Sequence, residues 1–87
     1  MSGETVLIAE DDAAIRTVVA RALSRQGYNV QATSIASPLW RWVVAGEGDV
    51  VITDVRMPGV DGMSVFRHVR RTSPETDVIL ITAYGEG

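Results

Sequence analysis

Short continuous runs of apolar, mostly β-branched residues recur along the chain, each bounded by polar positions. They cover residues 6–9, 50–52 and 78–81. Runs of this length and type are typical of strands that are buried on both faces, as in a parallel sheet. Residues 28–32 alternate more between polar and apolar positions, which favours an edge strand. The pattern therefore predicts four strands.

Two of the segments between these runs have apolar residues at helical spacing. Asp12 is placed to cap the first of these helices, and Gly27 stands where a glycine commonly ends one. The other helix is expected over residues 63–71, with Phe66 and Val69 facing inward. The predicted inner face of the first helix comprises Ile15, Val18, Val19, Ala22 and Leu23.

A further helix is expected over residues 39–45. Ser37 would be its cap, with Pro38 at the first helical position, and Ser34 is a competing cap. Strands and helices then alternate along the whole chain. This alternation predicts an α/β fold, with a parallel sheet, right-handed crossovers and helices on both faces.

Composition narrows the classes of function. The 87 residues are 46% hydrophobic, and eight basic against eleven acidic residues give a formal net charge of −3. This length fits one small domain, and the missing basic excess argues against direct binding of nucleic acid. The absence of cysteine excludes disulfides and zinc–thiolate sites. No apolar run approaches the roughly 18 residues of a membrane span, and no signal peptide is evident, so a cytoplasmic domain is expected.

Acidic residues follow two of the predicted strands, with Glu10, Asp11 and Asp12 after the first and Asp54 after the third. Ligands of open parallel sheets bind beyond the carboxyl ends of the strands, so Asp11, Asp12 and Asp54 are expected to converge. Two unit charges about 4 Å apart repel by about 4 kcal/mol at an effective dielectric constant of about 20. Such a cluster suits Mg²⁺, and a carboxylate beside the metal could form an aspartyl phosphate. Alternatively, Asp12 is a helix cap and Asp54 an ordinary loop carboxylate.

Three motifs together resemble the receiver domain of bacterial two-component response regulators. Residues 54–62 carry the pattern Asp-x-x-Met-Pro-x-x-Asp-Gly, residues 8–12 read Ile-Ala-Glu-Asp-Asp, and residues 78–83 end in Thr82-Ala83. The resemblance implies a flavodoxin-like (CheY-like) fold with strand order 2-1-3-4. Within the family, the chain looks most like the N-terminal receivers of NtrC-type nitrogen regulators, which act with sigma-54 polymerase.

The resemblance also implies a role for each motif residue. Asp54 would accept a phosphoryl group from the phosphohistidine of a sensor histidine kinase. Asp11 and Asp12 would hold Mg²⁺ together with Asp54 and the backbone carbonyl of Arg56, and Thr82 would contact the phosphoryl group as a switch. The domain would assist its own phosphorylation without turning over an external substrate, so it would not be an enzyme in the usual sense. Output domains outside the chain would regulate transcription.

The chain departs from the family pattern at its C-terminal end. It contains no lysine and stops after the fourth predicted strand. Residues 1–87 are therefore expected to be a truncated receiver that lacks the usual fourth helix, the fifth strand with its phosphoryl-contacting lysine, and the fifth helix. The exposed apolar edge of the fourth strand would favour self-association.

Two other functions stay open. One is a non-phosphorylated interaction or dimerisation fragment, because the lysine strand is missing. The other is a phosphatase of the haloacid dehalogenase type, which also uses a nucleophilic Asp after a parallel strand. That family requires a second Asp two residues later, where this chain has Arg56.

Overall fold

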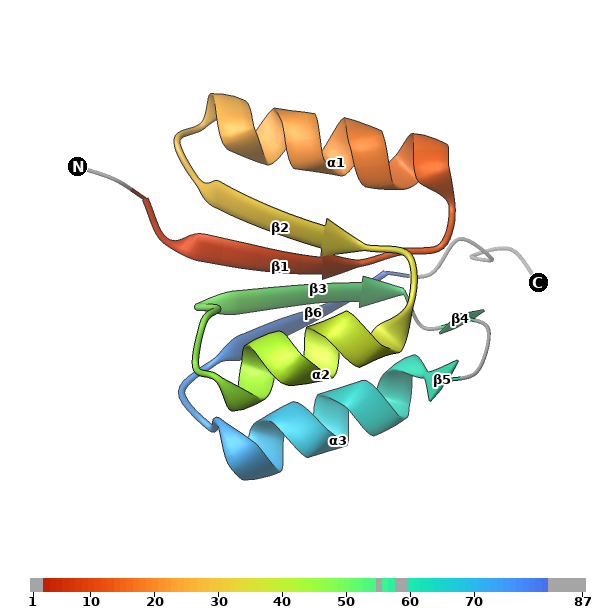
Figure 1. Ribbon diagram of the computed structural model, residues 1–87, viewed down its shortest axis with the longest axis vertical. Helices are drawn as coiled ribbons and strands as arrows, with labels where there is room; N and C mark the ends of the chain where they lie inside the picture. Colours follow the sequence, from red (N-terminus) through yellow and green to blue (C-terminus); the bar gives the residue numbers. More distant parts are fainter. Residues whose placement is uncertain (1–2, 55, 58–59, 82–87) are drawn as a thin grey trace.

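The computed structural model describes residues 3–54, 56–57 and 60–81 (Figure 1). The first half comprises β1 (Thr5–Ala9), α1 (Ala13–Arg25), β2 (Asn29–Thr33), α2 (Ala36–Val44) and β3 (Val50–Asp54). The second half comprises β4 (Arg56–Met57), β5 (Val60–Asp61), α3 (Gly62–Thr72) and β6 (Asp77–Ile81). In the part of the chain that is described, no helix is both long and apolar enough to cross a membrane.

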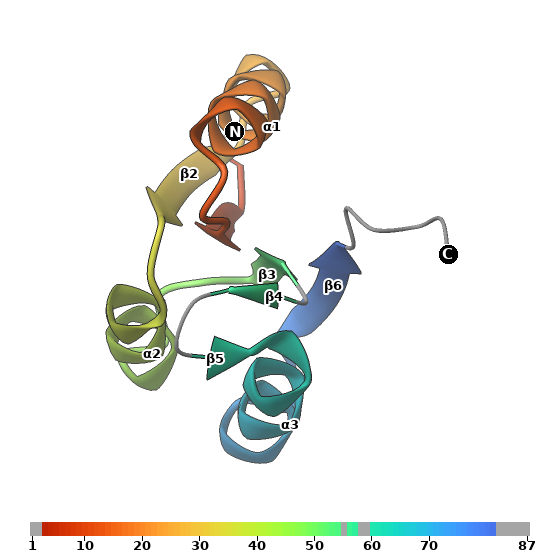
Figure 2. The same ribbon diagram turned by 90° about the vertical axis from the view of Figure 1, so that its right-hand side faces the viewer.

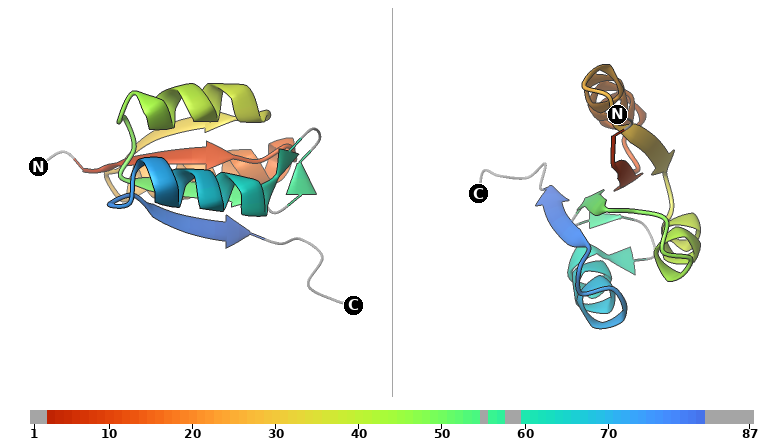
Figure 3. Two further views of the ribbon diagram at one scale, coloured as in Figure 1. Left: turned by 90° about the horizontal axis from the view of Figure 1, so that it is seen from below. Right: turned by 90° about the vertical axis from the view of Figure 1, so that its left-hand side faces the viewer.

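Four parallel strands form the main sheet in the order β2-β1-β3-β6. In β1, Val6 lies opposite both Val30 of β2 and Val50 of β3. Figure 3 shows these strands running in the same direction, so that their carboxyl ends share one edge of the sheet. The predicted order 2-1-3-4 is confirmed, with β6 as the fourth strand of the sheet.

The sheet separates two apolar clusters, with α1 on one face and α2 and α3 on the other (Figure 2). Successive residues of a strand point to opposite faces, so Leu7 and Ile8 belong to different clusters. The larger cluster, beneath α2 and α3, contains Leu7, Ala9, Leu39, Val43, Val51, Val65 and Val69. The smaller cluster, beneath α1, contains Val6, Ile8 and Ile52.

Helix α1 has the predicted ends but a different inner face. Asp12 is its N-cap, and Gly27, just beyond the C-cap, has a φ of +96° that favours glycine. Val19 and Leu23 pack on the sheet as predicted, whereas Val18 is exposed. The predicted inner face of α1 is wider than the part of the helix that packs on the sheet, because α1 lies over β1 and β2 at one side of the sheet.

Helix α2 begins three residues earlier than predicted, and neither Ser34 nor Ser37 is its N-cap. Ile35 occupies the N-cap position without a side-chain cap bond. The Thr33 hydroxyl shapes this entry instead, since it accepts a hydrogen bond from the Ile35 amide and donates one to the Ile35 carbonyl. Pro38 falls in the first turn, where a missing N–H leaves no helix bond unmade.

The short strands β4 and β5 pair antiparallel close to the carboxyl ends of the main strands (Figure 1). They were not predicted, and they lead directly into α3. In α3, Val69 is buried as expected, but Val65 rather than Phe66 is its second buried apolar residue.

Strand β6 is an edge strand and is less buried than its apolar sequence predicts. Within residues 3–54, 56–57 and 60–81 it pairs with β3 alone. Ile79 is 51% exposed, and alternation places it on the face covered by α1, which lies over other strands. The exposed apolar edge expected from the sequence is therefore present in the described residues.

Candidate functional site

Asp54 is the last residue of β3, a strand that lies between β1 and β6. Its side chain is 6% exposed although it is a carboxylate. Burial of a carboxylate is costly unless hydrogen bonds, a shared proton or a cation compensates for the lost water. A buried Asp at the carboxyl edge of a parallel sheet therefore indicates a binding site rather than an ordinary loop residue.

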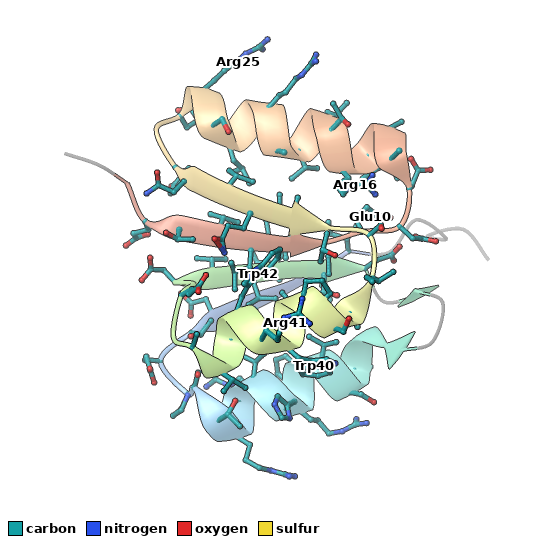
Figure 4. The ribbon with its side chains drawn as sticks, in the orientation of Figure 1. Glu10, Arg16, Arg25, Trp40, Arg41 and Trp42 are labelled. Carbon is teal, nitrogen blue, oxygen red and sulfur yellow. The ribbon has the colours of Figure 1, made fainter. Side chains whose placement is uncertain are left out.

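Glu10 follows β1 directly and is held at three points. Its amide donates to the Thr33 carbonyl at 3.0 Å, and its own carbonyl accepts from Arg16 Nη1 at 2.8 Å. Its carboxylate Oε2 accepts from the Asp12 amide at 3.0 Å. With 2% of its surface exposed, Glu10 is the most buried acidic side chain among the described residues. Figure 4 shows it at the end of β1, beside Arg16 of α1.

Three carboxylates converge at this edge of the sheet. Glu10, Asp11 and Asp54 each offer an oxygen, and these oxygens lie within 4.8 Å of one another. Glu10 and Asp54 are buried, whereas Asp11 is exposed to solvent. Solvent therefore reaches the group at Asp11.

The electrostatics of this group favour a bound cation. Burial raises the pKa of the Glu10 carboxyl above its ordinary value of 4.5, and the nearby Asp54 carboxyl raises this pKa further. The hydrogen bond from the Asp12 amide acts in the opposite direction. A divalent cation would offset both the lost hydration of the Glu10 carboxylate and its repulsion from Asp54.

The residues present fit Mg²⁺. All three groups supply oxygen, the donor that Mg²⁺ prefers, and Mg²⁺ commonly binds through one or two carboxylates while keeping several waters. Asp11 is exposed to solvent, so waters can reach an ion held by these groups. In the described residues, Glu10, Asp11 and Asp54 would hold the ion.

The structure brings Asp11 and Asp54 together as expected, but it puts Glu10 rather than Asp12 beside them. Asp12 Oδ1 accepts a hydrogen bond from the Ile15 amide at 3.0 Å and caps α1. The alternative interpretation of Asp12, as a helix cap, is the one that this geometry supports. The chain turns into α1 at Asp12, so its carboxylate faces the free amides of the helix instead of Asp54.

Two further predicted residues are only partly described or not described. The backbone of Arg56 begins β4, two residues after Asp54, and its role as a carbonyl ligand stays a prediction. Thr82 lies outside the described residues.

The register of the sheet contains the signal that could have identified Glu10. Ile8 lies opposite Ile52 in the β1–β3 pair, and both belong to the cluster beneath α1. Two residues further along each strand, the same register brings position 10 opposite position 54 on the same face. The alternation of side chains along the two strands would therefore have identified Glu10 as the acidic residue opposite Asp54.

Comparison with known proteins agrees with this fold. The family model described as the response regulator receiver domain matches residues 6–87. The DNA-binding transcriptional regulator NtrC of Rhizobium meliloti (strain 1021) is 48% identical over 83 residues, which cover 95% of this chain and 17% of that protein. The chain thus spans less than a fifth of this relative.

Solved structures share the fold over almost the whole chain. The response regulator TrrA of Thermotoga maritima, in complex with Mg²⁺-BeF, has a TM-score of 0.86 and 28% identity, covering 94% of this chain and 71% of TrrA. TrrA in complex with the histidine kinase ThkA has a TM-score of 0.85. A CheY-like receiver from Methanospirillum hungatei JF-1 has a TM-score of 0.89 and 22% identity, covering 98% of this chain and 68% of that protein.

The predicted flavodoxin-like arrangement is thus confirmed by the strand order and by these neighbours. The family match covers nearly all of the chain, including the segments that carry Glu10, Asp11 and Asp54. The chain therefore belongs to the response regulator receiver domain family of two-component systems.

Proposed function

We propose that the chain is a phosphoacceptor, which takes a phosphoryl group from a phosphohistidine of a sensor histidine kinase onto Asp54. The observation that carries this proposal is the burial of Asp54 beside Glu10 and Asp11 at the carboxyl edge of the sheet. Two properties of the relative TrrA support it, since TrrA forms a complex with the kinase ThkA and another with Mg²⁺-BeF.

In the proposed transfer, a carboxylate oxygen of Asp54 attacks the phosphorus atom. The bond between phosphorus and the imidazole nitrogen breaks, its electron pair stays on that nitrogen, and an acyl phosphate forms on Asp54. Mg²⁺, when bound, would offset the negative charge of the phosphoryl oxygens. Glu10 and Asp11 would hold the ion together with Asp54, and the burial of Asp54 would limit the access of water to the acyl phosphate.

Thr82 would contact the phosphoryl group, and the Arg56 carbonyl would complete the protein ligands of the ion. The chain would assist this single transfer to itself without turning over an external substrate. Similarity to the DNA-binding transcriptional regulator NtrC supports a role in transcription regulation through domains outside these 87 residues. That this role is cytoplasmic and of the nitrogen and sigma-54 type is part of the proposal, and it rests on the resemblance of the sequence motifs. The negative charge of this segment argues that those domains, rather than this one, bind DNA.

Intact-mass spectrometry tests the proposal. The chain is incubated with Mg²⁺ and a small acyl phosphate such as acetyl phosphate, with Asp54→Asn and an EDTA-treated sample in parallel. The expected result is one added phosphoryl group in the wild-type chain with Mg²⁺, and none in either control. A folded chain that gains no phosphate, or an Asp54→Asn variant that gains as much, would contradict the proposal.

A second candidate function is a non-phosphorylated interaction module that pairs with another copy of itself. The exposure of Ile79 on the edge strand β6 favours it, because an apolar edge can pair with a second chain. The mass measurement separates the two functions, since an interaction module alone would gain no phosphate.

A further inference from the structure

Arg16 connects helix α1 to the loop that carries the carboxylates. It lies in the first turns of α1, its side chain is half-buried, and its Nη1 donates to the Glu10 carbonyl at 2.8 Å. Figure 4 shows this side chain close to Glu10, whereas Arg25 on the same helix extends away from the sheet. The bond of Arg16 therefore lies at the site, not on the outer surface of the helix.

The atom that Arg16 contacts matters for Asp11. The Glu10 carbonyl belongs to the peptide unit that joins Glu10 to Asp11, and a peptide unit is planar. Fixing the direction of this carbonyl fixes the plane of the unit, and with it the direction in which the chain leaves toward Asp11. Asp11 is exposed, and its carboxylate oxygen lies within 4.8 Å of those of Glu10 and Asp54, so its place in the group depends on this direction.

The chemistry of the guanidinium suits this task. It stays protonated at every ordinary pH and offers donors but no acceptor, so it cannot itself ligate a cation. Its bond goes to a backbone carbonyl, which leaves the carboxylate oxygens of the site available. Groups that orient metal ligands in this way commonly change metal affinity by roughly 10–100-fold when they are removed.

We propose that Arg16 is a positioning residue of the Mg²⁺ site. Through the Glu10 carbonyl it presents the Asp11 carboxylate to the cation that Asp54 and Glu10 share, and so it sets the affinity for Mg²⁺. It does not contact the phosphoryl group, so the rate at saturating Mg²⁺ does not depend on it. This inference rests on the proposed function and adds a residue outside the carboxylate group.

The test measures the rate of phosphorylation by acetyl phosphate over a range of Mg²⁺ concentrations, together with Mg²⁺ binding by calorimetry without the donor. In Arg16→Gln, the half-saturating Mg²⁺ concentration should rise roughly tenfold while the maximal rate stays unchanged. Arg16→Lys keeps one cationic donor and should lie between Arg16→Gln and the wild-type chain. Arg21→Gln removes an exposed arginine from the same helix and should behave as the wild type.

Tryptophan fluorescence during urea unfolding reports whether each variant is folded. If Arg16→Gln does not fold, Arg16→Lys supplies the result: a raised half-saturating concentration supports the inference, and an unchanged one overturns it. A folded Arg16→Gln with wild-type Mg²⁺ affinity, or with a lower maximal rate at unchanged affinity, overturns the inference alone. A wild-type chain that binds no Mg²⁺ overturns the proposed function and the inference together.

Discussion

Asp12 and Glu10 flank Asp11, yet their carboxylates have different partners. Asp12 accepts from the Ile15 amide, and Glu10 lies beside Asp54. Asp12→Ala should therefore lower the free energy of unfolding by about 1 kcal/mol, whereas Asp12→Ser should keep the cap and the stability. Neither change should alter the Mg²⁺ affinity, which calorimetry measures.

Asp11→Asn is the matched comparison for this prediction. It should weaken Mg²⁺ binding, because it removes a charged ligand from the group. If Asp12→Ser weakens Mg²⁺ binding as much as Asp11→Asn does, then Asp12 is a ligand and its role as a cap alone is wrong.

The burial of Glu10 predicts that stability depends on pH in the absence of metal. Burial raises the pKa of its carboxyl above 4.5, so the folded chain binds this proton more tightly than the unfolded chain does. The free energy of unfolding should then fall as the pH rises from about 4.5 through the raised pKa of the folded state. Glu10→Gln cannot titrate, so its profile should lack this fall.

Urea unfolding in EDTA at several pH values measures both profiles. The difference between the wild type and Glu10→Gln isolates Glu10 from the other groups that titrate. Addition of Mg²⁺ at neutral pH should stabilise the wild-type chain and have less effect on Glu10→Gln. Parallel pH profiles for the two chains would show that the pKa of Glu10 is not raised in the folded state.

At the scale of elements, helix α2 packs on the sheet with one face and exposes the other to solvent. Leu39 is fully buried in the larger cluster, whereas Val44 of the same helix is 72% exposed. Leu39→Ala should lower the free energy of unfolding by about 2–5 kcal/mol, because it leaves a cavity. Val44→Ala should change it by less than about 0.5 kcal/mol.

Trp40 and Trp42 make this difference measurable. Both lie on α2 and pack against the larger cluster, and Trp40 also contacts the His68 ring of α3 at 4.4 Å between centroids. Their fluorescence should therefore follow the loss of α2 and α3 from the sheet during urea unfolding. Equal losses of stability in Leu39→Ala and Val44→Ala would mean that α2 is not attached in this way.

The main elements could be predicted because each has a recognisable pattern of apolar residues. The helix α1, for example, has both a side-chain cap at Asp12 and a glycine at its end. The strands β4 and β5 have two residues each, too few to leave a pattern. The start of α2 depends on hydrogen bonds of the Thr33 hydroxyl, which the spacing of apolar residues does not reveal.

The site, like the fold, could be predicted from the sequence only in part. Asp54 follows from its place after a buried strand, and Asp11 from its place in the loop after β1. The inclusion of Glu10 depends on the register of β1 against β3, and the separation of Asp12 depends on where α1 begins. Both are details of tertiary structure that a run of three acidic residues does not disclose.

At the scale of the whole molecule, the outer edge of β6 predicts self-association of the 87-residue chain. The described residues place Ile79 on this edge strand with half of its surface exposed. We expect sedimentation equilibrium to give a mass above that of a monomer. Ile79→Lys should shift the equilibrium toward the monomer, because a charged residue disfavours edge pairing.

Val18→Lys is the control, since it places the same charge on an exposed apolar position of α1. It should leave the association unchanged. A wild-type chain that stays monomeric at high concentration would contradict self-association through β6, and an equal effect of both variants would place the contact elsewhere.

The most direct test of the account identifies the residue that carries the phosphoryl group. The chain is phosphorylated with acetyl phosphate and Mg²⁺, the acyl phosphate is reduced with borohydride, and the peptides are sequenced by mass spectrometry. Reduction converts a phosphorylated aspartate into homoserine. The account predicts homoserine at position 54 and unmodified residues at positions 10–12. Homoserine at position 11 or 12, or none in a folded chain, would contradict it.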